Sequence, residues 1–529
     1  MIKKIPQWQS LGHLLREQAE KIGARTLLRF EGESMSFAQV EEGTNRLANV
    51  LRQHHVHKGD KVAVMLPNGL EFPLAWLAIA KLGAVMVPVN VQYREKELQD
   101  VLNHSEAKLA VVGMQQIEVL QRAQPQCNFL REMAVFANEV RSSNNVVDLR
   151  REMEQAPTNF VIDAIPPRRD DLLNLQYTSG TTGFPKACML THKYWLQLAQ
   201  GTFAYGKIRS DDVNLTAQPF YYMDPQWNLV LCMMAGIPLV ILPRFSASTF
   251  WQSITENAVT FFYLIGAMPV YLLKQPENPT FEKNHRVRFV LCSGIVPQLH
   301  ATFESRWGMP WRELYGSTES GGDLQVPLEN ADCVGTGTVG IPFPGKEAKV
   351  VDENDHELPD GEVGELVVRG EPMMSGYYKN SEATKEKIRH GWLHTGDLFR
   401  KDKHGYFYLV GRLKDMVRRS GENISAAEVE GVLCEHPAVR ASAVVPVPDD
   451  LRGEEAKAFI QLQDGATLDP EELLAFAQKK LAAFKTPRFI EVVEKFPLTP
   501  SERIAKHELL KSKPDQRKGA YDAIIKQWG

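Results

Sequence analysis

Tyr177-Thr-Ser-Gly-Thr-Thr-Gly-Phe-Pro-Lys-Ala187 is the most informative stretch of this 529-residue chain. It follows the apolar run 172–175, which predicts a strand, and we expect a helix after it. Glycines let the backbone turn tightly and aim N–H groups inward, hydroxyls add donors, and a lysine adds a positive charge. A plain surface turn would explain a few of these residues but not the whole stretch. We predict a triphosphate-binding loop, distinct from the GxxxxGK(S/T) P-loop, made by Thr178, Ser179, Gly180, Thr181, Thr182, Gly183 and Lys186.

Outward from this loop, short β-branched runs alternate with amphipathic stretches. We expect strands at 61–66, 85–89, 109–112, 238–242, 260–265 and 287–292, and helices at 71–82 and 93–104. Strand–helix alternation implies parallel sheets covered by helices, so the predicted fold class is α/β.

The residue composition of the sequence changes at two places. Residues 141–170 are polar and contain prolines, which predicts a surface connection. Beyond residue 340, frequent Gly and Asp turns separate short strands such as 364–369, which predicts a small antiparallel subdomain. The chain then ends in what we expect to be a small α+β domain. A length of 529 residues also requires more than one domain.

Bulk composition excludes several classes of protein. The net charge of -4 gives no reason to expect nucleic acid or an anionic membrane as a partner. The six cysteines are scattered without a CxxC pair, which favours free thiols in a reducing compartment. The apolar stretch 72–89 is interrupted by Pro, Lys and Gly, which favours a buried helix and strand over a membrane span. With no apolar signal-peptide region at the start, we expect a cytoplasmic protein.

The loop at 177–187 closely resembles the phosphate-loop motif of the adenylate-forming superfamily, which includes acyl-CoA synthetases, luciferases and peptide-synthetase adenylation domains. The resemblance continues in the family's order along nearly the whole chain. Ser293-Gly294 stands where the family binds adenine. Leu314-Tyr-Gly-Ser-Thr-Glu319 resembles the YGxTE element. By this resemblance the nucleotide-binding residues there are Ser293, Gly294, Tyr315, which stacks on adenine, Gly316, Ser317 and Thr318, with Thr181 and Glu319 facing Mg²⁺.

Further motifs of the family follow downstream. Trp392-Leu-His-Thr-Gly-Asp397 resembles the ribose-binding motif, with Asp397 accepting from the ribose hydroxyls. In Gly411-Arg-Leu-Lys-Asp415, Arg412 would also reach the nucleotide and Lys414 would be the hinge. The resemblance thus implies an AMP-binding adenylation domain at 1–413 and a mobile C-terminal domain at 414–529. The stretch 419–425 resembles the loop that lines the CoA channel, which here would use Ser420, Gly421 and Glu422.

The resemblance implies an ATP-dependent acyl-CoA ligase that needs ATP, Mg²⁺ and CoA. Attack of a carboxylate on the α-phosphate of ATP gives an acyl-adenylate, and the CoA thiol then displaces AMP. The charge that develops on pyrophosphate needs a lysine and a divalent cation, which Lys186 and Glu319-bound Mg²⁺ would supply. No Ser-His-Asp nucleophile is required, so we expect His192 and His394 to be structural. Whether the enzyme forms a homodimer is left open.

The acyl acceptor and the acid are less defined. The sequence most resembles bacterial medium/long-chain and crotonobetaine/carnitine-type CoA ligases. Tyr222 occupies the usual position of a histidine, and Tyr221, Tyr222 and Trp227 are the candidate acyl-pocket residues. With Asp224 they would either hold a quaternary ammonium through cation–π contact or pack a helix into the core. Two other functions stay open: an acyl-AMP ligase that loads a carrier protein, and a nucleotide- or acyl-binding regulator with impaired adenylation.

The last motif departs from the family pattern. The family ends with a TPSGK-like motif whose lysine serves adenylation, but here Glu502 replaces the glycine and Arg503 the lysine. Arginine keeps the charge with a broader planar group. Three interpretations are open: Arg503 does the work less efficiently, Lys506 substitutes for it, or adenylation is feeble. We favour the first because Arg503 keeps the motif register.

Overall fold

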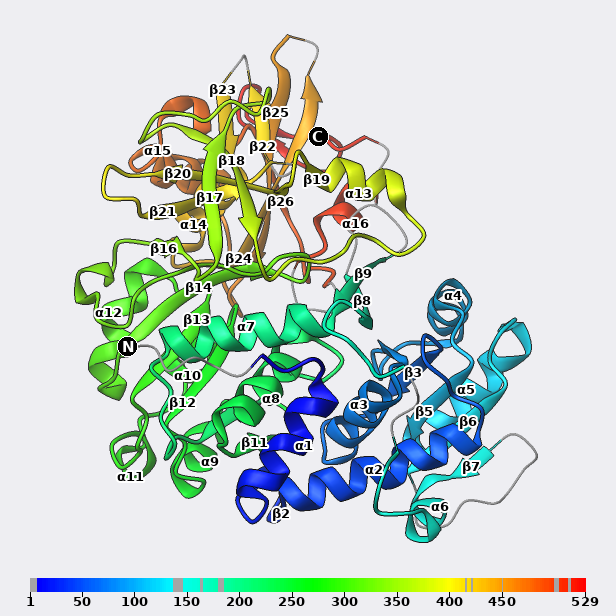
Figure 1. Cartoon of the computed structure of the whole chain (residues 1–529). Helices are drawn as coiled ribbons and strands as arrows, with labels where there is room; N and C mark the ends of the chain where they lie inside the picture. Colours follow the sequence, from blue (N-terminus) through cyan, green and yellow to red (C-terminus); the bar gives the residue numbers. More distant parts are fainter. Residues whose placement is uncertain are drawn as a thin grey trace. The chain divides into compact units, whose positions relative to one another are not determined.

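The computed structural model describes residues 7–136, 146–161, 165–178, 185–413, 416–419, 422–449, 451–498, 504–511 and 515–529. The chain divides into two compact units, drawn in Figure 1. The first comprises residues 1–178, 187–347 and 369–391, and the second comprises 179–186, 348–368 and 392–529. The short strands after residue 348 therefore group with the C-terminal residues. The functional boundary between residues 413 and 414 stays a prediction.

One sheet of the first unit is built from the N-terminal third of the chain. Its strands are β3 (Lys61–Met65), β4 (Val85–Pro88), β5 (Leu109–Gly113), β6 (Glu132–Phe136), β7 (Val146–Asp148), β8 (Leu172–Thr178) and β9 (Lys186–Thr191). They lie in the order β7-β6-β5-β3-β4-β8-β9, and the pairs from β7 to β8 are parallel. The predicted parallel sheet is confirmed.

The other sheet of this unit carries the middle of the chain. Its strands are β1 (Thr26–Phe30), β2 (Glu33–Ser36), β10 (Asn214–Thr216), β11 (Leu239–Ile241), β12 (Phe261–Ile265), β13 (Phe289–Ser293), β14 (Trp311–Ser317), β15 (Gly321–Gln325) and β16 (Thr338–Pro342). Strands β10 to β14 pair in parallel, so their carboxyl ends meet at one edge. The pairs β14–β15 and β15–β16 are antiparallel.

Helices cover both faces of both sheets. They are α1 (Leu11–Ile22), α2 (Phe37–Gln53), α3 (Glu71–Leu82), α4 (Glu95–Ser105), α5 (Ile117–Ala123), α6 (Leu149–Gln155), α7 (His192–Tyr205), α8 (Met223–Ala235), α9 (Phe250–Glu256), α10 (Met268–Leu273), α11 (Pro279–Glu282), α12 (Pro297–Trp307) and α13 (Ser381–Lys387). In β3, Val62 joins a central core with α1, α2, α3, α7 and α8, whereas Ala63 faces α4 and α5. In β12, Phe261 faces the same central core and Phe262 faces α9, α10 and α12. Because successive side chains in each strand point to opposite faces of the sheet, this unit is built of layers in the order helix, sheet, helix, sheet, helix.

Helix α3 shows how the sequence sets these elements. Every residue from Phe72 to Leu82 is buried, and the helix ends at Gly83 with φ +69°, a conformation that glycine adopts at low cost. Strand β4 follows, so the stretch 72–89 is a buried helix and strand as predicted. Across the residues that the structure describes, no helix is long and apolar enough to cross a membrane.

Two expectations need correction. The segment after the phosphate loop is strand β9, and helix α7 begins only at His192, where the Thr191 side chain accepts from the Tyr194 N–H. Part of the expected surface connection at 141–170 is ordered as β7 and α6. Strand β7 and helix α6 are too short to show a clear periodicity of apolar residues in the sequence.

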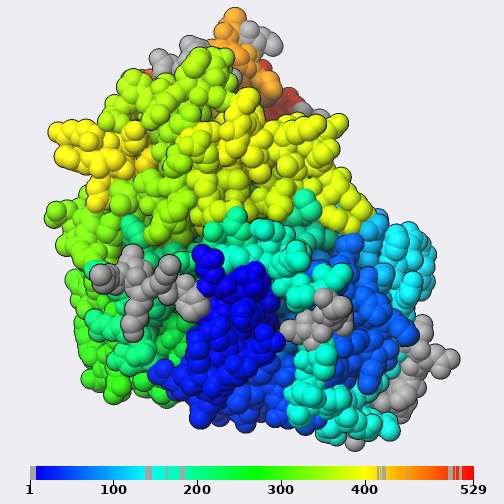
Figure 2. Space-filling model, viewed as in Figure 1, coloured from blue at the N-terminus to red at the C-terminus, as the bar shows by residue number. Residues whose placement is uncertain are grey.

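The start of the chain packs on the first unit. Arg169 donates to the carbonyl of Trp8 at 3.0 Å, and the Leu11 N–H donates to His192 Nδ1 at 3.3 Å. Figure 2 shows this dark blue segment on the face in view, bordered by other residues of the unit. Burial lowers the pKa of His192 to about 4, so the ring is neutral and structural, as expected.

The second unit contains an antiparallel group of strands and an α+β part. Most of β17 (Lys346–Val351) and β18 (Val363–Gly370) lie in it with β20 (Trp392–Lys401) and β21 (Phe407–Arg412), and the pairs β18–β20 and β20–β21 are antiparallel. The α+β part contains β22 (Met416–Arg419), β23 (Glu422–Ser425), α14 (Ala426–Cys434), β24 (Val439–Asp449), β25 (Gly453–Leu462), α15 (Pro470–Gln478), β26 (Phe489–Val492), α16 (Lys506–Lys511), β27 (Tyr521–Asp522) and β28 (Gln527–Trp528). Both parts match the antiparallel and α+β folds predicted from the sequence.

Candidate active site

A tight turn at the carboxyl end of β13 stands where the sequence predicts adenine. Ser293 ends the strand, and Gly294 follows with φ +98°. The backbone N–H groups of Gly294 and Ile295 donate to the two carboxylate oxygens of Glu313 on β14, at 2.6 and 2.8 Å. Burial raises the pKa of Glu313 to about 8, while the two backbone donors act in the opposite direction. Glu313, which sequence reasoning missed, holds this turn in place.

Tyr263 joins the predicted adenine turn to the predicted acyl pocket. Its hydroxyl donates to Ser293 Oγ at 2.8 Å, and Ser293 Oγ donates to the carbonyl of Leu314. Its ring meets Trp227 edge-on, with ring centroids 5.3 Å apart. Trp227 is 3% exposed and donates through Nε1 to Thr202 Oγ1 at 3.1 Å. Trp227 therefore belongs to the core.

Tyr221 and Tyr222 lie next to each other at the start of α8. Both are half-buried, and their ring centroids are 4.7 Å apart. The carbonyl of Tyr221 accepts from Gln176 at 2.7 Å, which ties this segment to β8. Burial, and then the charge of Asp224 in the first turn of α8, raise the pKa of Tyr263. Asp224 is thus close enough to Tyr263 to act on it electrostatically.

The YGSTE element forms the tight connection between β14 and β15. Ser317 lies opposite Gly321, so residues 318–320 make the turn. A Cβ on Gly316 would lie 1.9 Å from the Gly321 carbonyl oxygen, so only glycine fits there. The Tyr194 hydroxyl donates to the Thr318 carbonyl at 3.0 Å and holds the turn from α7. Tyr315, Gly316, Ser317 and Thr318 are therefore fixed together.

Glu319 projects from the same turn. Its Oε1 accepts a hydrogen bond from the Tyr377 hydroxyl at 2.9 Å, and its backbone carbonyl accepts from Met374 N at 2.8 Å. Tyr377 is 5% exposed, and burial raises its pKa well above the usual range, so the hydroxyl stays a donor. Tyr377 is a second contact that sequence reasoning missed.

A series of polar side chains, connected by hydrogen bonds and an ion pair, supports this turn from within the unit. Ser317 Oγ lies 2.8 Å from Ser320 Oγ, and Ser320 donates to Asp323 at 2.5 Å. Asp323 forms an ion pair with Lys346 at 3.5 Å, and both side chains are fully buried. Lys346 also donates to the carbonyls of Gly370 and Pro372. The two charges compensate each other where an isolated one would be costly.

In the second unit, the predicted ribose-binding carboxylate is already oriented. Asp397 on β20 lies opposite Arg412 on β21, with Oδ1 and Nε 3.3 Å apart. The Asp397 N–H donates to Thr395 Oγ1 at 3.1 Å, and the Gly396 N–H donates to Glu365 Oε1 at 2.9 Å. The structure therefore brings together Asp397 and Arg412, which the sequence had linked only through separate motifs.

Several predicted residues fall outside the described part of the chain. Thr178 ends β8 and Lys186 begins β9, so the two ends of the phosphate loop are placed. Glu422 lies on β23, and its side chain is not described. The residues outside are Ser179, Gly180, Thr181, Thr182, Gly183, Lys414, Ser420, Gly421 and Arg503.

Family models match both parts of the chain. One described as "AMP-binding enzyme" matches residues 15–378, and one described as "AMP-binding enzyme C-terminal domain" matches residues 428–503. The chain is 32% identical over 515 residues to the crotonobetaine/carnitine–CoA ligase of Citrobacter koseri, covering 95% of this chain and 99% of the relative. The ligase of the same name from Proteus mirabilis matches with the same identity and coverage.

Solved structures agree with these matches. The anthranilate CoA ligase AuaEII in complex with anthranoyl-AMP has a TM-score of 0.86 at 25% identity, covering 96% of this chain and 98% of that one. ATP-bound MatB from Rhodopseudomonas palustris has a TM-score of 0.85 at 26% identity, with 95% and 98% covered. The o-succinylbenzoate CoA synthetase MenE from Bacillus subtilis, in complex with the acyl-adenylate OSB-AMP, has a TM-score of 0.82 at 26% identity, with 94% and 97% covered.

Proposed function

The chain belongs to the family of AMP-binding enzymes, and from that premise we propose how its residues carry out ATP-dependent acyl-CoA ligation. A carboxylate is a poor acyl donor because its leaving group would be oxide. Attack on the α-phosphate of ATP releases pyrophosphate and leaves an acyl-adenylate, whose leaving group is AMP. The thiol of CoA then takes the acyl group. The enzyme is thus an AMP-forming acid–CoA ligase.

We propose that the nucleotide-binding residues implied by the family resemblance have that role here. In the first unit, the fixed turn at Ser293 and Gly294 receives the adenine, and Tyr315 stacks on it. In the second unit, Asp397 accepts from the ribose hydroxyls, and Arg412 orients that carboxylate. The observation that carries this assignment is the network that holds the turn after β13, namely Glu313 on the backbone and Tyr263 on Ser293. Donors and acceptors that are already held in position lose little conformational entropy when a ligand binds.

We assign phosphate chemistry to Lys186 and Glu319. Lys186 follows the phosphate loop directly and would neutralise the charge that develops on pyrophosphate. Glu319 offers a half-buried carboxylate oriented by Tyr377, a hard oxygen ligand of the kind that Mg²⁺ prefers. When bound, Mg²⁺ would stabilise negative charge on the phosphates.

CoA is the proposed acyl acceptor, in line with the names of the Citrobacter and Proteus relatives. The alternative is an acyl-AMP ligase that loads a carrier protein. The wild-type enzyme can be given the same acyl-AMP with either free CoA or a holo-carrier protein, and thioester formation followed by mass spectrometry. Faster transfer to CoA supports the proposal, and transfer to the carrier alone contradicts it. ATP–pyrophosphate exchange in the presence of acid excludes the other alternative, a binding protein with impaired adenylation.

We further propose that the acid carries a quaternary ammonium group. Two curated relatives are named for crotonobetaine and carnitine, and Asp224, in the first turn of α8, follows the Tyr221–Tyr222 pair in the sequence and acts electrostatically on Tyr263. Carboxylate charge and tyrosine faces both attract such a cation. The test compares a trimethylammonium-substituted butanoate with its neutral tert-butyl isostere, because the two share shape but differ in charge. A higher kcat/KM for the cation supports the proposal, and preference for the neutral acid contradicts it.

We propose a cytoplasmic enzyme on the ground of its free cysteines: all six carry free thiols. Gel filtration with light scattering decides between a monomer and a homodimer.

A further inference from the structure

Three buried amide side chains connect strand β8 to helix α8. Asn174 and Gln176 project from the same face of β8, Gln226 lies on α8, and all three are at most 2% exposed. Trp76 Nε1 donates to Asn174 Oδ1 at 3.0 Å, and Asn174 Nδ2 donates to Gln226 Oε1 at 2.7 Å. Gln226 Nε2 donates to Gln176 Oε1 at 3.3 Å, and Gln176 Nε2 donates to the carbonyl of Tyr221 at 2.7 Å. We call Asn174, Gln226 and Gln176 the amide network.

The direction of these hydrogen bonds is fixed from both ends. The indole N–H of Trp76 can only donate, and the carbonyl of Tyr221 can only accept. Asn174 therefore turns its oxygen to the indole and its nitrogen to Gln226, and the same order follows at Gln226 and Gln176. Because a single orientation of each amide satisfies the whole series, a change at one amide disturbs the others.

The amide network ends on the backbone of the segment before α8. Gln226 Nε2 also donates to the carbonyl of Phe220 at 2.9 Å, so side chains hold the carbonyls of both Phe220 and Tyr221. Asn68 binds two further backbone groups of this segment: its Oδ1 accepts from the Phe220 N–H at 2.9 Å, and its Nδ2 donates to the Gln218 carbonyl at 3.0 Å. Side-chain amides therefore fix the path of this irregular segment.

The same segment carries the candidate acyl-pocket tyrosines. Tyr221 and Tyr222 are half-buried, and the Tyr222 N–H donates to the Pro219 carbonyl at 3.0 Å. Between them and Pro219, the fully buried Phe220 packs on Phe72 with ring centroids 5.2 Å apart. The two tyrosine rings thus project from a backbone whose place is set by buried contacts.

Gln226 also lies near the start of α8, two residues after Asp224. Its amide therefore holds the first turn of the helix that carries this carboxylate, as well as the segment before it. Both features proposed to attract an ammonium group, the tyrosine faces and the carboxylate, depend on the position of this turn.

We propose that Gln226 and Gln176 are positioning residues that determine which acids the enzyme accepts. The inference rests on the proposed function, in which Tyr221 and Tyr222 line the acyl pocket. A pocket of fixed shape separates substrates that differ by one methylene by about 10–200-fold. If the amide network is broken, the segment before α8 becomes free to move, and this discrimination should fall.

The test uses the full-length enzyme with Gln226→Met, which keeps the length of the side chain and removes its hydrogen bonds. The matched control is Asn228→Leu, which breaks a buried amide pair between the same helix and β10, Asn214 Nδ2 to Asn228 Oδ1 at 2.9 Å. The assay measures kcat/KM for trimethylammonium-substituted butanoate and for the corresponding pentanoate. We expect the ratio of the two values to fall about tenfold in Gln226→Met. The KM for ATP in this variant, and the acid ratio in Asn228→Leu, should change by less than about twofold.

Hydrogen–deuterium exchange tests the positioning role without any acid. The N–H groups of Phe220 and Tyr222 are hydrogen-bonded, so a peptide spanning them should exchange slowly in the wild type. Exchange of this peptide should become at least about tenfold faster in Gln226→Met and stay unchanged in Asn228→Leu. Gln176→Met, which removes fewer hydrogen bonds, should act in the same direction and guards against a folding defect in Gln226→Met.

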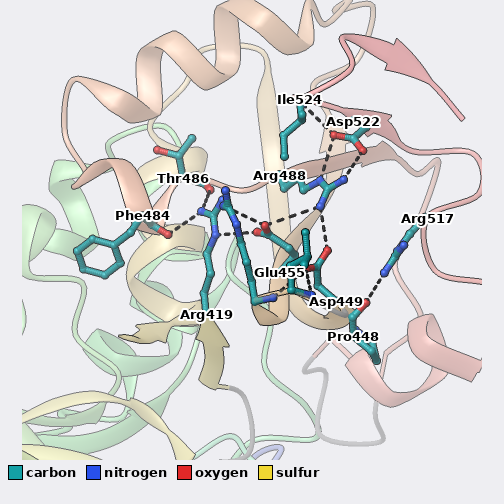
Figure 3. Close-up of polar contacts among 12 residues, drawn as sticks. Arg419, Pro448, Asp449, Glu455, Phe484, Thr486, Arg488, Arg517, Asp522 and Ile524 are labelled. Carbon is teal, nitrogen blue, oxygen red and sulfur yellow. Dashed lines mark hydrogen bonds and ion pairs between the residues drawn. The ribbon is translucent and has the colours of Figure 1, made fainter. Parts of the chain in front are cut away.

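A second control reports the effect of lower stability alone. Glu455 on β25 is fully buried in the second unit, and Figure 3 shows Arg419 and Arg488 pointing toward it. Glu455 Oε2 lies 2.8 Å from Arg419 Nε, so Glu455→Gln weakens a buried ion pair. All variants are assayed below their unfolding midpoints, and Glu455→Gln should leave the acid ratio within about twofold of the wild-type value.

Several results would overturn the proposal. They are unchanged exchange in both glutamine variants, an unchanged acid ratio beside faster exchange, or an equal fall of the ratio in the two controls. Tyr222→Ala separates this proposal from the pocket assignment. If Tyr222→Ala alters the acid ratio and the glutamine variants do not, this proposal alone fails. If none of these variants alters it, the pocket assignment fails as well.

Discussion

The hydrogen bond from Tyr377 to Glu319 allows a sharp test of the proposed magnesium ligand. Tyr377→Phe removes the hydroxyl that lies 2.9 Å from Glu319 Oε1 and keeps a ring that is 5% exposed, so it should leave the packing intact. The Glu319 carboxylate would then lose the donor that holds its orientation. We expect adenylation to slow, and we expect the Mg²⁺ concentration that gives the half-maximal rate to rise.

The geometry sets the size of this effect. A hydrogen bond to a charged acceptor contributes about 1.5–3 kcal/mol, and the lower end applies here because Glu319 is only half-buried. About 1.4 kcal/mol corresponds to a tenfold change in rate. Tyr377→Phe should therefore slow adenylation about tenfold, and Glu319→Ala, which removes the ligand itself, about 10²-fold or more.

The assay is acid-dependent ATP–pyrophosphate exchange across a range of Mg²⁺ concentrations. Thioester formation from supplied acyl-AMP serves as the internal control, because that step needs no pyrophosphate chemistry. Thermal unfolding of each variant checks that the fold is retained. Exchange at the wild-type rate in Glu319→Ala would refute the ligand assignment, and an unaltered Mg²⁺ dependence in Tyr377→Phe would refute the orienting role of the tyrosine.

Further predictions concern residues of the other elements. Lys414→Pro should preserve adenylation while CoA transfer collapses, because proline fixes φ at the predicted hinge; parallel loss in separate half-reaction assays would indicate damaged folding instead. Tyr222→Ala should change the acid preference more than the KM for ATP, and an unchanged acid profile would return the residue to the core. Arg503→Ala should depress acyl-AMP formation and spare transfer, and Arg503→Lys should preserve or raise it. Lys506 pairs with Glu430 at 2.6 Å, so Lys506→Ala should be the milder change in the same assay, and the reverse order would assign the role to Lys506.

Elements with strong local signals were predicted well. Helix α3 spans the predicted residues 71–82 because Pro67-Asn-Gly69 ends the preceding strand and Gly83 ends the helix. Strand β9 was missed because a glycine- and proline-containing loop precedes it, and local pattern does not decide between strand and helix there. The choice between strand and helix depends on pairing with a neighbouring strand, and a few consecutive residues of sequence do not reveal that pairing.

The motif residues of the candidate site were predicted from the sequence, but the residues that hold them in place were not. Glu313 lies nineteen positions from Gly294, Tyr263 thirty from Ser293, and Tyr377 fifty-eight from Glu319. Each contact depends on how parallel strands and connecting segments align, which no motif spacing encodes.

The central claim is AMP-forming ligation of an acid to CoA, and one measurement tests it most directly. The wild-type enzyme is incubated with ATP, Mg²⁺, CoA and a panel of carboxylic acids that includes betaines, and all products are quantified. The account predicts that an accepted acid yields AMP, pyrophosphate and acyl-CoA in equal amounts, and that omission of ATP abolishes the thioester. Formation of ADP and phosphate with the thioester, or release of pyrophosphate without any acyl-CoA, would contradict it.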